Sequence, residues 1–152
     1  MVDVGALDVN GTVRELFKDA KYVGVDMRPG PNVDVVLNGH ELSTYFPEDS
    51  VDCIVCFDTL EHDIKFWETV YEMRKILRPQ GWLLIGVPSF NHGRHEHPSD
   101  YYRFLDTALE QFMFNGFINV QVWLGIWTTR THSSNEATSN NPDQIFGWGQ
   151  KP

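Results

Sequence analysis

Residues 51–62 read VDCIVCFDTLEH, an apolar run that ends in Asp58, Glu61 and His62. The run 52–57 is apolar at nearly every position, which predicts a strand that is buried on both faces of a sheet. Such strands are typical of parallel sheets, because the crossover connections cover both faces. The polar residues after the run then lie at the carboxyl end of the strand, where sheets of this kind carry their functional loops.

The rest of the chain continues this alternation of strands and helices. Further strands are predicted over 1–5, 22–26, 33–37, 82–88 and 117–124, with 125–130 as a candidate seventh strand. Helices are predicted over 12–19, 64–78 and 101–115, where apolar residues recur at helical spacing. This order predicts the α/β class, with a doubly wound, mostly parallel sheet and helices on both of its faces.

The chain is predicted to form one domain, since 152 residues suffice for a single core. Residues 1–130 carry the alternating elements, whereas 131–152 begin with THSSNEATSNNPDQ, a stretch with few apolar residues. We therefore expect 131–152 to be a polar tail or lid segment of the same domain. Phe146 and Trp148 near its end can dock on the body of the domain.

Composition argues against several classes of partner. The formal net charge is −9, so the surface repels a phosphate backbone and we expect no nucleic acid partner. No run of about 18 apolar residues is present, so we expect no membrane-spanning helix. The first residues, MVDVGAL, lack the features of a signal peptide, which favours the cytoplasm by default.

Cys53 and Cys56 form a CxxC pair, but they point to opposite faces of the predicted strand, so we interpret them as buried hydrophobes.

Three residues near the start of the chain describe a nucleoside-binding crevice. Gly5 and Gly11 flank the loop after the first strand, where glycine lets the backbone approach a ligand and a helix N-terminus offers free N–H groups. Asp26 ends the second strand, where a carboxylate can accept hydrogen bonds from both ribose hydroxyls. An ordinary tight turn between strand and helix is the alternative.

Two further stretches, PEDSVDCIVCFDTLEH (47–62) and LRPQGWLLIGVPS (77–89), make the pattern specific. Together with the glycine loop and Asp26, they resemble the class I S-adenosylmethionine-dependent methyltransferases, in particular the small-molecule, type 11-like group, over about residues 2–118. The resemblance implies a seven-stranded Rossmann-like sheet, S-adenosyl-L-methionine as cofactor and S-adenosyl-L-homocysteine as product. It also implies a small-molecule acceptor, methylated on oxygen more than on nitrogen. The family's usual helix before the first strand is missing, which suggests a truncated chain, an open site or a lid supplied elsewhere.

The resemblance also assigns cofactor contacts. The methionine part is assigned to Asp3, Gly5 and the loop from Ala6 to Gly11, which includes Asp8 and Asn10. Asp26 is assigned to the ribose, Met27 and His40 to the adenine, and Phe57, Asp58 and Thr59 to the sulfonium. The loop departs from the family's GxGxG, because it lacks the central glycine and is longer. Which of Asp8 and Asn10 faces the cofactor therefore stays open.

The acceptor side is predicted from the loops after the fourth and fifth strands. His62 is the candidate catalytic base or acceptor-orienting residue, and a cap or packing role is the alternative. His92 and His95 are assigned to acceptor binding. Their HxxHxH run with His97 could also hold a metal ion, although we expect none. In the stretch DYYRF, Tyr101 and Arg103 are further acceptor candidates, with a structural salt bridge as the alternative for Arg103.

Several alternatives to this function stay open or are disfavoured. No NPPY-like motif follows the fourth strand, which disfavours methylation of amide nitrogens in DNA or protein. A dinucleotide-linked oxidoreductase is disfavoured because GxGxxG is absent. A non-catalytic methyltransferase-like binding module stays open. The expected partner is a small-molecule substrate, and a homodimer is also open.

Overall fold

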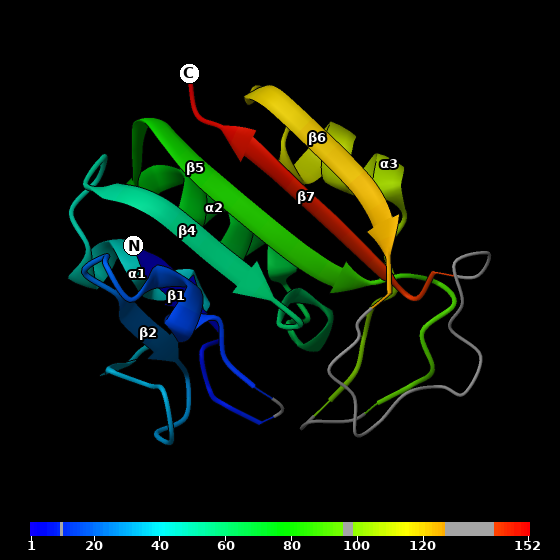
Figure 1. The fold of residues 1–152 in the computed structure, drawn as a ribbon, viewed down its shortest axis with the longest axis horizontal. Coiled ribbons are helices and arrows are strands. Elements are labelled where there is room, and N and C mark those ends of the chain that lie inside the picture. Colours follow the sequence, from blue (N-terminus) through cyan, green and yellow to red (C-terminus); the bar gives the residue numbers. More distant parts are fainter. Residues whose placement is uncertain (10, 96–98, 127–141) are drawn as a thin grey trace.

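The computed structural model describes residues 1–9, 11–95, 99–126 and 142–152. They form one seven-stranded sheet in the order β3-β2-β1-β4-β5-β7-β6 (Figure 1). The strands are β1 (Val2–Val4), β2 (Val23–Asp26), β3 (Val35–Val36), β4 (Val51–Phe57), β5 (Leu77–Pro88), β6 (Ile118–Gly125) and β7 (Gln144–Gln150). The α-helices are α1 (Leu42–Tyr45), α2 (Phe66–Ile76) and α3 (Asp106–Ala108). Short helical turns lie at η1 (Arg14–Phe17), η2 (Gly39–Glu41) and η3 (Leu60–His62), and a π-helical segment, η4, covers Leu109–Met113.

The sheet is mostly parallel, as the sequence predicts. Strands β1 to β5 pair only in parallel with one another. Strand β7 enters between β5 and β6 and runs antiparallel to both. The α/β class and the Rossmann-like, seven-stranded architecture are therefore confirmed.

The prediction of a polar tail or lid over 131–152 is wrong for residues 144–150, because these form β7 inside the sheet. Residues 127–141 lie outside the described residues, and with them nearly all of the candidate strand 125–130. The segment IFGWGQ misled the prediction because its glycines dilute the apolar signal. Those glycines have a packing role, since a Cβ on Gly147 would lie 2.7 Å from the Phe114 ring.

Two of the predicted helices are shorter than expected. Only 14–17 of the predicted helix 12–19 is helical, as a 3₁₀ turn, and Leu16 is 80% exposed. A short helix without an apolar partner is only marginally stable. In the predicted helix 101–115, helical structure begins at Asp106. The backbone N–H groups of Tyr101 and Phe104 instead bind the carbonyls of Glu61 and Pro88.

The core lies between the sheet and the layer formed by α1, α2, α3 and η4. In Figure 1, α2 and α3 lie behind the sheet, and α1 packs against α2. Alternate strand residues such as Ile54, Leu83, Ile85 and Ile145 belong to this core, as do Met73 and Leu109 from the helices. Cys56 is part of it, whereas Cys53 is not, and both cysteines are free.

The opposite surface of the sheet, which we call the aromatic face, consists of Phe57, Trp82, Trp123, Phe146 and Trp148. Neighbouring strand residues place these rings side by side, with ring centroids 5.9 Å apart for Phe57–Phe146 and 4.7 Å apart for Trp123–Trp148. Trp82 and Trp123 are 37% and 41% exposed. In the part of the chain that the structure describes, no α-helix covers this face. Within the described ranges, the expected helical cover is therefore found on the face of α2 and α3 and not on the aromatic face.

Candidate functional site

The loop after β1 and the end of β2 converge, as the nucleoside crevice requires. The N–H groups of Gly5 and Ala6 both donate to the carbonyl of Val25, at 2.8 and 2.9 Å. The Asp26 carboxylate accepts the N–H of Leu7 at 3.3 Å and that of Arg28 at 2.9 Å. Two neighbouring parallel strands therefore deliver the glycine loop and the carboxylate to one place at the edge of the sheet.

Gly5 also meets the end of β4. Its φ is +81°, and a Cβ there would lie 1.9 Å from Oγ1 of Thr59. The Thr59 hydroxyl donates to the carbonyl of Phe57 at 2.8 Å. No larger residue fits at position 5, because both the backbone conformation and the contact with Thr59 require glycine. The ends of β1, β2 and β4 are thus held together at the predicted cofactor residues.

Asp3 is buried beneath this crevice. The Tyr22 hydroxyl donates to its carboxylate, and Asn32 Nδ2 donates to the Tyr22 oxygen at 3.0 Å. Burial raises the pKa of Asp3 to about 6, although the hydrogen bond from Tyr22 acts in the opposite direction. Burial and the contact with Asp3 together raise the pKa of Tyr22 to about 12. Tyr22 and Asn32 were not singled out in the sequence, since a polar residue beside a predicted strand carries no specific signal.

The remaining predicted cofactor residues differ in where they lie. Asp8 is turned toward its own loop and accepts the N–H of Gly11 at 2.8 Å, whereas Asn10 lies outside the described residues. Met27 is 63% exposed beside Asp26. His40 faces α2, where its ring nitrogens lie 2.9 Å from Asp63 Oδ2 and 3.4 Å from Glu68 Oε2. Since carboxylates already engage the His40 ring, a role in adenine binding stays a prediction without support from this geometry.

A second group of polar residues lies at the ends of β4 and β5. Asp58, which has a left-handed φ of 46°, donates its N–H to the carbonyl of Gly86 at 3.0 Å. Burial and the charge of Glu61 raise the pKa of Asp58 to about 7, against the lowering effects of Gln144, His92 and His95. Gln144 is the first residue of β7, so the misassigned terminal strand contributes to this group.

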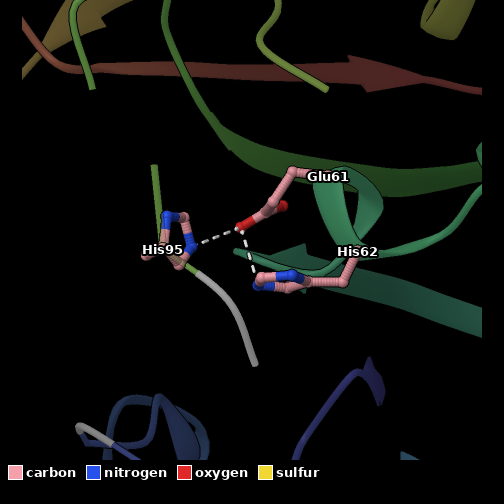
Figure 2. Close-up of side chains that lie close together, drawn as sticks. All are labelled: Glu61, His62 and His95. Atoms are coloured by element: carbon pink, nitrogen blue, oxygen red, sulfur yellow. Dashed lines mark ion pairs between the residues drawn. The ribbon is translucent and has the colours of Figure 1, made fainter. Parts of the chain in front are cut away.

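Glu61 is the central residue of this group and carries no role in the sequence-based assignment. Its side chain is fully buried, with Oε1 3.5 Å from His62 Nε2 and 3.4 Å from His95 Nε2 (Figure 2). Burial raises the pKa of Glu61 to about 7, and the charge of His62 acts against this rise. An acid next to His62 in the stretch LEH was the available signal, but only the fold shows that it is buried and that His95 reaches it.

Arg103 organises the loop after β5. Its guanidinium donates to both Asp100 carboxylate oxygens, each at 2.6 Å, and to the backbone carbonyls of His92, Gly93 and Tyr102. Burial alone would raise the pKa of Asp100, but the hydrogen bonds from Arg103 and from the His95 N–H lower it to about 2. All five N–H groups of Arg103 are used, which favours the structural salt bridge over direct acceptor binding.

Tyr101, His62 and His92 complete the acceptor side. Tyr101 is 49% exposed, and its N–H donates to the Glu61 carbonyl at 2.8 Å. His62 Nδ1 donates to the carbonyl of Ser99, so in the neutral ring Nε2 carries the lone pair. The His92 ring packs against His95 with centroids 4.7 Å apart. The predicted acceptor residues therefore do lie in one neighbourhood, adjacent to Thr59 and Asp58.

A groove elsewhere on the surface is separate from this site. It runs over α2 and is lined by Trp67, Tyr71, Arg74 and Phe112, among others. Of the residues assigned above to cofactor and acceptor binding, His40 lines this groove and the others do not. In the described residues no helix is long and apolar enough to cross a membrane.

Comparisons with known proteins agree with the fold and show the family. The family described as "Methyltransferase domain" matches residues 2–85, more than half of the chain. No curated protein matches the chain.

Three solved structures illustrate the structural likeness. A SAM-dependent methyltransferase from Archaeoglobus fulgidus superposes with a TM-score of 0.74 at 15% identity, covering 99% of this chain and 85% of that one. The Haemonchus contortus phosphoethanolamine N-methyltransferase 2, in complex with phosphomonomethylethanolamine and S-adenosylhomocysteine, gives 0.69 at 17% identity, with 100% and 48% coverage. The Burkholderia thailandensis 1,6-didemethyltoxoflavin-N1-methyltransferase, with its substrate and S-adenosylhomocysteine bound, gives 0.68 at 17% identity, with 99% and 69% coverage. The chain belongs to the methyltransferase-domain family and is a class I S-adenosylmethionine-dependent methyltransferase.

Proposed function

We propose that the chain methylates a small-molecule acceptor, on oxygen in preference to nitrogen, with the cofactor held at the ends of β1, β2 and β4. The observation that carries this proposal is the convergence of the Gly5 loop on the Asp26 carboxylate. Two of the solved relatives hold small-molecule ligands, phosphomonomethylethanolamine in one and 1,6-didemethyltoxoflavin in the other, which supports a small acceptor here. We expect the protein to act in the cytoplasm, as a monomer or homodimer.

The residues at the crevice fit S-adenosylmethionine. Among the described residues, the Asp26 carboxylate accepts two backbone N–H groups, which leaves acceptor positions on it for the two ribose hydroxyls. No described atom lies within 4 Å of a Cβ built on Gly11, so the loop borders open space. We assign Asp3, Gly5, Ala6, Asp8 and Gly11 to the methionine side, Met27 to the adenine, and Phe57, Asp58 and Thr59 to the region of the sulfonium.

The cofactor supplies a methyl group that is already activated on a sulfonium, so the protein mainly has to position the acceptor and remove its proton. His62 is suited to the second task. Its Nδ1–H is held by the Ser99 carbonyl, so Nε2 is free to accept a proton from an acceptor hydroxyl. Because a hydroxyl must lose its proton on methylation, we rank an oxygen acceptor above an amine. His92, His95 and Tyr101 are assigned to acceptor binding, with Arg103 positioning their loop.

Calorimetry with S-adenosylhomocysteine, with NAD as the comparison ligand, tests the cofactor assignment. We expect binding of the first at one site per chain and no binding of the second. Turnover is tested with a cofactor that carries an isotope-labelled methyl group and a metabolite library grouped into hydroxyl and amine acceptors. Failure to bind S-adenosylhomocysteine would overturn the assignment of the crevice. Label transfer confined to amines would overturn the oxygen preference.

A further inference from the structure

Three polar side chains from two separate loops meet at the acceptor side. Glu61 and His62 lie on η3, directly after β4, and His95 lies in the loop after the neighbouring strand β5. Figure 2 shows the Glu61 carboxylate directed between the two imidazole rings. One carboxylate oxygen and one nitrogen of each ring all lie within 4.8 Å of one another. The arrangement presents two nitrogen donors and one oxygen donor to a common point.

The separations of these atoms match a metal centre. Glu61 Oε1 is 3.5 Å from His62 Nε2 and 3.4 Å from His95 Nε2. In a tetrahedral zinc site with bonds of about 2.0–2.2 Å, neighbouring ligand atoms are about 3.3–3.6 Å apart. Two of the three distances between the ligand atoms, those from Glu61 Oε1 to the two imidazole nitrogens, therefore already have this length. The third distance, between the two imidazole nitrogens, is at most 4.8 Å.

The Glu61 carboxylate lacks the partners that a buried carboxylate needs. Both of its oxygens are buried, and among the described residues neither accepts a hydrogen bond. The two imidazoles lie at ion-pair distance but not in hydrogen-bonding geometry. Burying a carboxylate without partners is expensive, and such groups in native proteins are paired or bind a metal ion. A cation between Glu61 and the two rings would supply the missing partner.

His62 is also held from behind, as metal ligands are. Its Nδ1 donates to the Ser99 carbonyl, which leaves the Nε2 lone pair on the side of Glu61. A hydrogen bond of this kind from the second ring nitrogen fixes the orientation of a metal-binding histidine. The backbone of His95, rather than its ring, is held by Asp100, which accepts the His95 backbone N–H at 2.7 Å, and the His95 ring Nδ1 lies 3.4 Å from Arg103 Nη2.

We propose that Glu61, His62 and His95 form a binding site for one divalent transition-metal ion, with Zn²⁺ as the first choice. Two imidazole nitrogens and one carboxylate oxygen are the donor set of open zinc sites, which keep a fourth position for water or an oxygen of a substrate. With the ion bound, the His62 Nε2 lone pair is a ligand and no longer a base, so the role of base assigned to His62 above belongs to the metal-free protein, and a metal-bound hydroxide would take the acceptor's proton instead. The sequence suggested a different set, His92, His95 and His97, and we expected no metal from it. Of these three, His95 belongs to the cluster and His97 lies outside the described residues, whereas Glu61 and His62 come from the other loop.

The site is tested by titrating Zn²⁺ into the full chain after treatment with a chelator, with calorimetry as the readout. We expect one ion per chain, and a rise in melting temperature at saturating Zn²⁺. Glu61→Gln and His95→Ala should each weaken Zn²⁺ binding by at least about 100-fold. His40→Gln is the matched control, because it removes a histidine with two carboxylate neighbours outside the cluster, and it should leave Zn²⁺ affinity unchanged.

Glu61→Gln keeps the shape of the side chain and removes a buried charge without partners, so the metal-free variant should melt no earlier than the wild type. A loss of Zn²⁺ binding in this variant is then not a loss of fold. The proposal is overturned if Zn²⁺, Co²⁺, Mn²⁺ and Fe²⁺ all fail to bind the wild type stoichiometrically, or if both variants bind Zn²⁺ as tightly as the wild type. Binding of S-adenosylhomocysteine, measured on the same metal-free wild type, tells a failure here from a failure of the proposed function.

Discussion

Asp26 accepts two backbone hydrogen bonds and, in our assignment, keeps two acceptor positions for the ribose of the cofactor. Asp26→Ala should therefore weaken S-adenosylhomocysteine binding by an order of magnitude or more, through the loss of about two charge-assisted hydrogen bonds at roughly 1.5–3 kcal/mol each. Calorimetry measures the change. Asp19→Ala, an exposed aspartate elsewhere, is the control. An unchanged affinity in Asp26→Ala would mean that the ribose lies elsewhere.

Asp3 makes the stability of the protein depend on pH. Its pKa rises from 3.8 to about 6 on folding, so between about pH 4 and pH 6 the folded state holds a proton that the unfolded state has lost. The free energy of unfolding therefore falls as pH rises through this range, by at most about 3 kcal/mol for this group. Asp3→Asn should remove the contribution of Asp3 to this fall in unfolding free energy. The variant should be more stable than the wild type at pH 7, because it buries no charge at position 3.

Urea unfolding of the wild type and Asp3→Asn at pH 4, 5, 6 and 7 measures this dependence. The difference between the two proteins isolates Asp3 from other groups that titrate in this range. A difference that stays constant over pH 4–7 would contradict a raised pKa for Asp3 in the folded protein.

Strand β7 shows at the scale of elements why the end of the chain belongs to the sheet. It pairs with β5 over its whole length, and its glycines allow Phe114 and Phe117 to pack against the backbone. Gly147→Ala places a methyl group 2.7 Å from the Phe114 ring, so it should destabilise the protein by about 1–3 kcal/mol. Thermal or urea unfolding measures the effect. At Gly93 a Cβ meets nothing within 4 Å, so Gly93→Ala should stay close to wild-type stability.

The loop after β5 and the turn η3 stabilise each other. They are joined by hydrogen bonds from the Tyr101 N–H to the Glu61 carbonyl and from His62 Nδ1 to the Ser99 carbonyl. Helix-like spacing over 101–115 predicted one continuous helix. These contacts between loops instead use the backbone groups of 101–104, and the helix begins only afterwards.

At the scale of the whole molecule, the described α-helices pack on one face of the sheet. Leu83 and Trp82 are neighbours in β5, yet Leu83 is fully buried under the helices and Trp82 is 37% exposed on the aromatic face. Leu83→Ala should therefore cost about 2–5 kcal/mol of unfolding free energy, and Trp82→Ala clearly less, although tryptophan is the larger side chain. Urea unfolding of the two variants gives the comparison. The reverse order would show that the aromatic face is covered in solution.

Much of the parallel part of the sheet was readable from the sequence. The apolar runs at β1, β2, β4 and β5 encode strands locally, and parallel strands bring their carboxyl ends to one edge whatever the rest of the chain does. The meeting of Gly5, Asp26 and Thr59 follows from that rule. The type 11-like resemblance added the cofactor, which the residues alone describe only as a nucleoside ligand.

The sequence by itself determined the fold class, the family and the edge of the sheet where the predicted site residues lie, because these depend on local apolar patterns and on strand direction. The tertiary structure decided the insertion of β7, the one-sided helical cover and the meeting of Glu61 with His95. Each of these depends on contacts between residues far apart in the chain, such as Ile85 with Gly147, that leave no periodic signal in either partner. Burial singles out the Glu61 side chain, which its place in the sequence does not reveal.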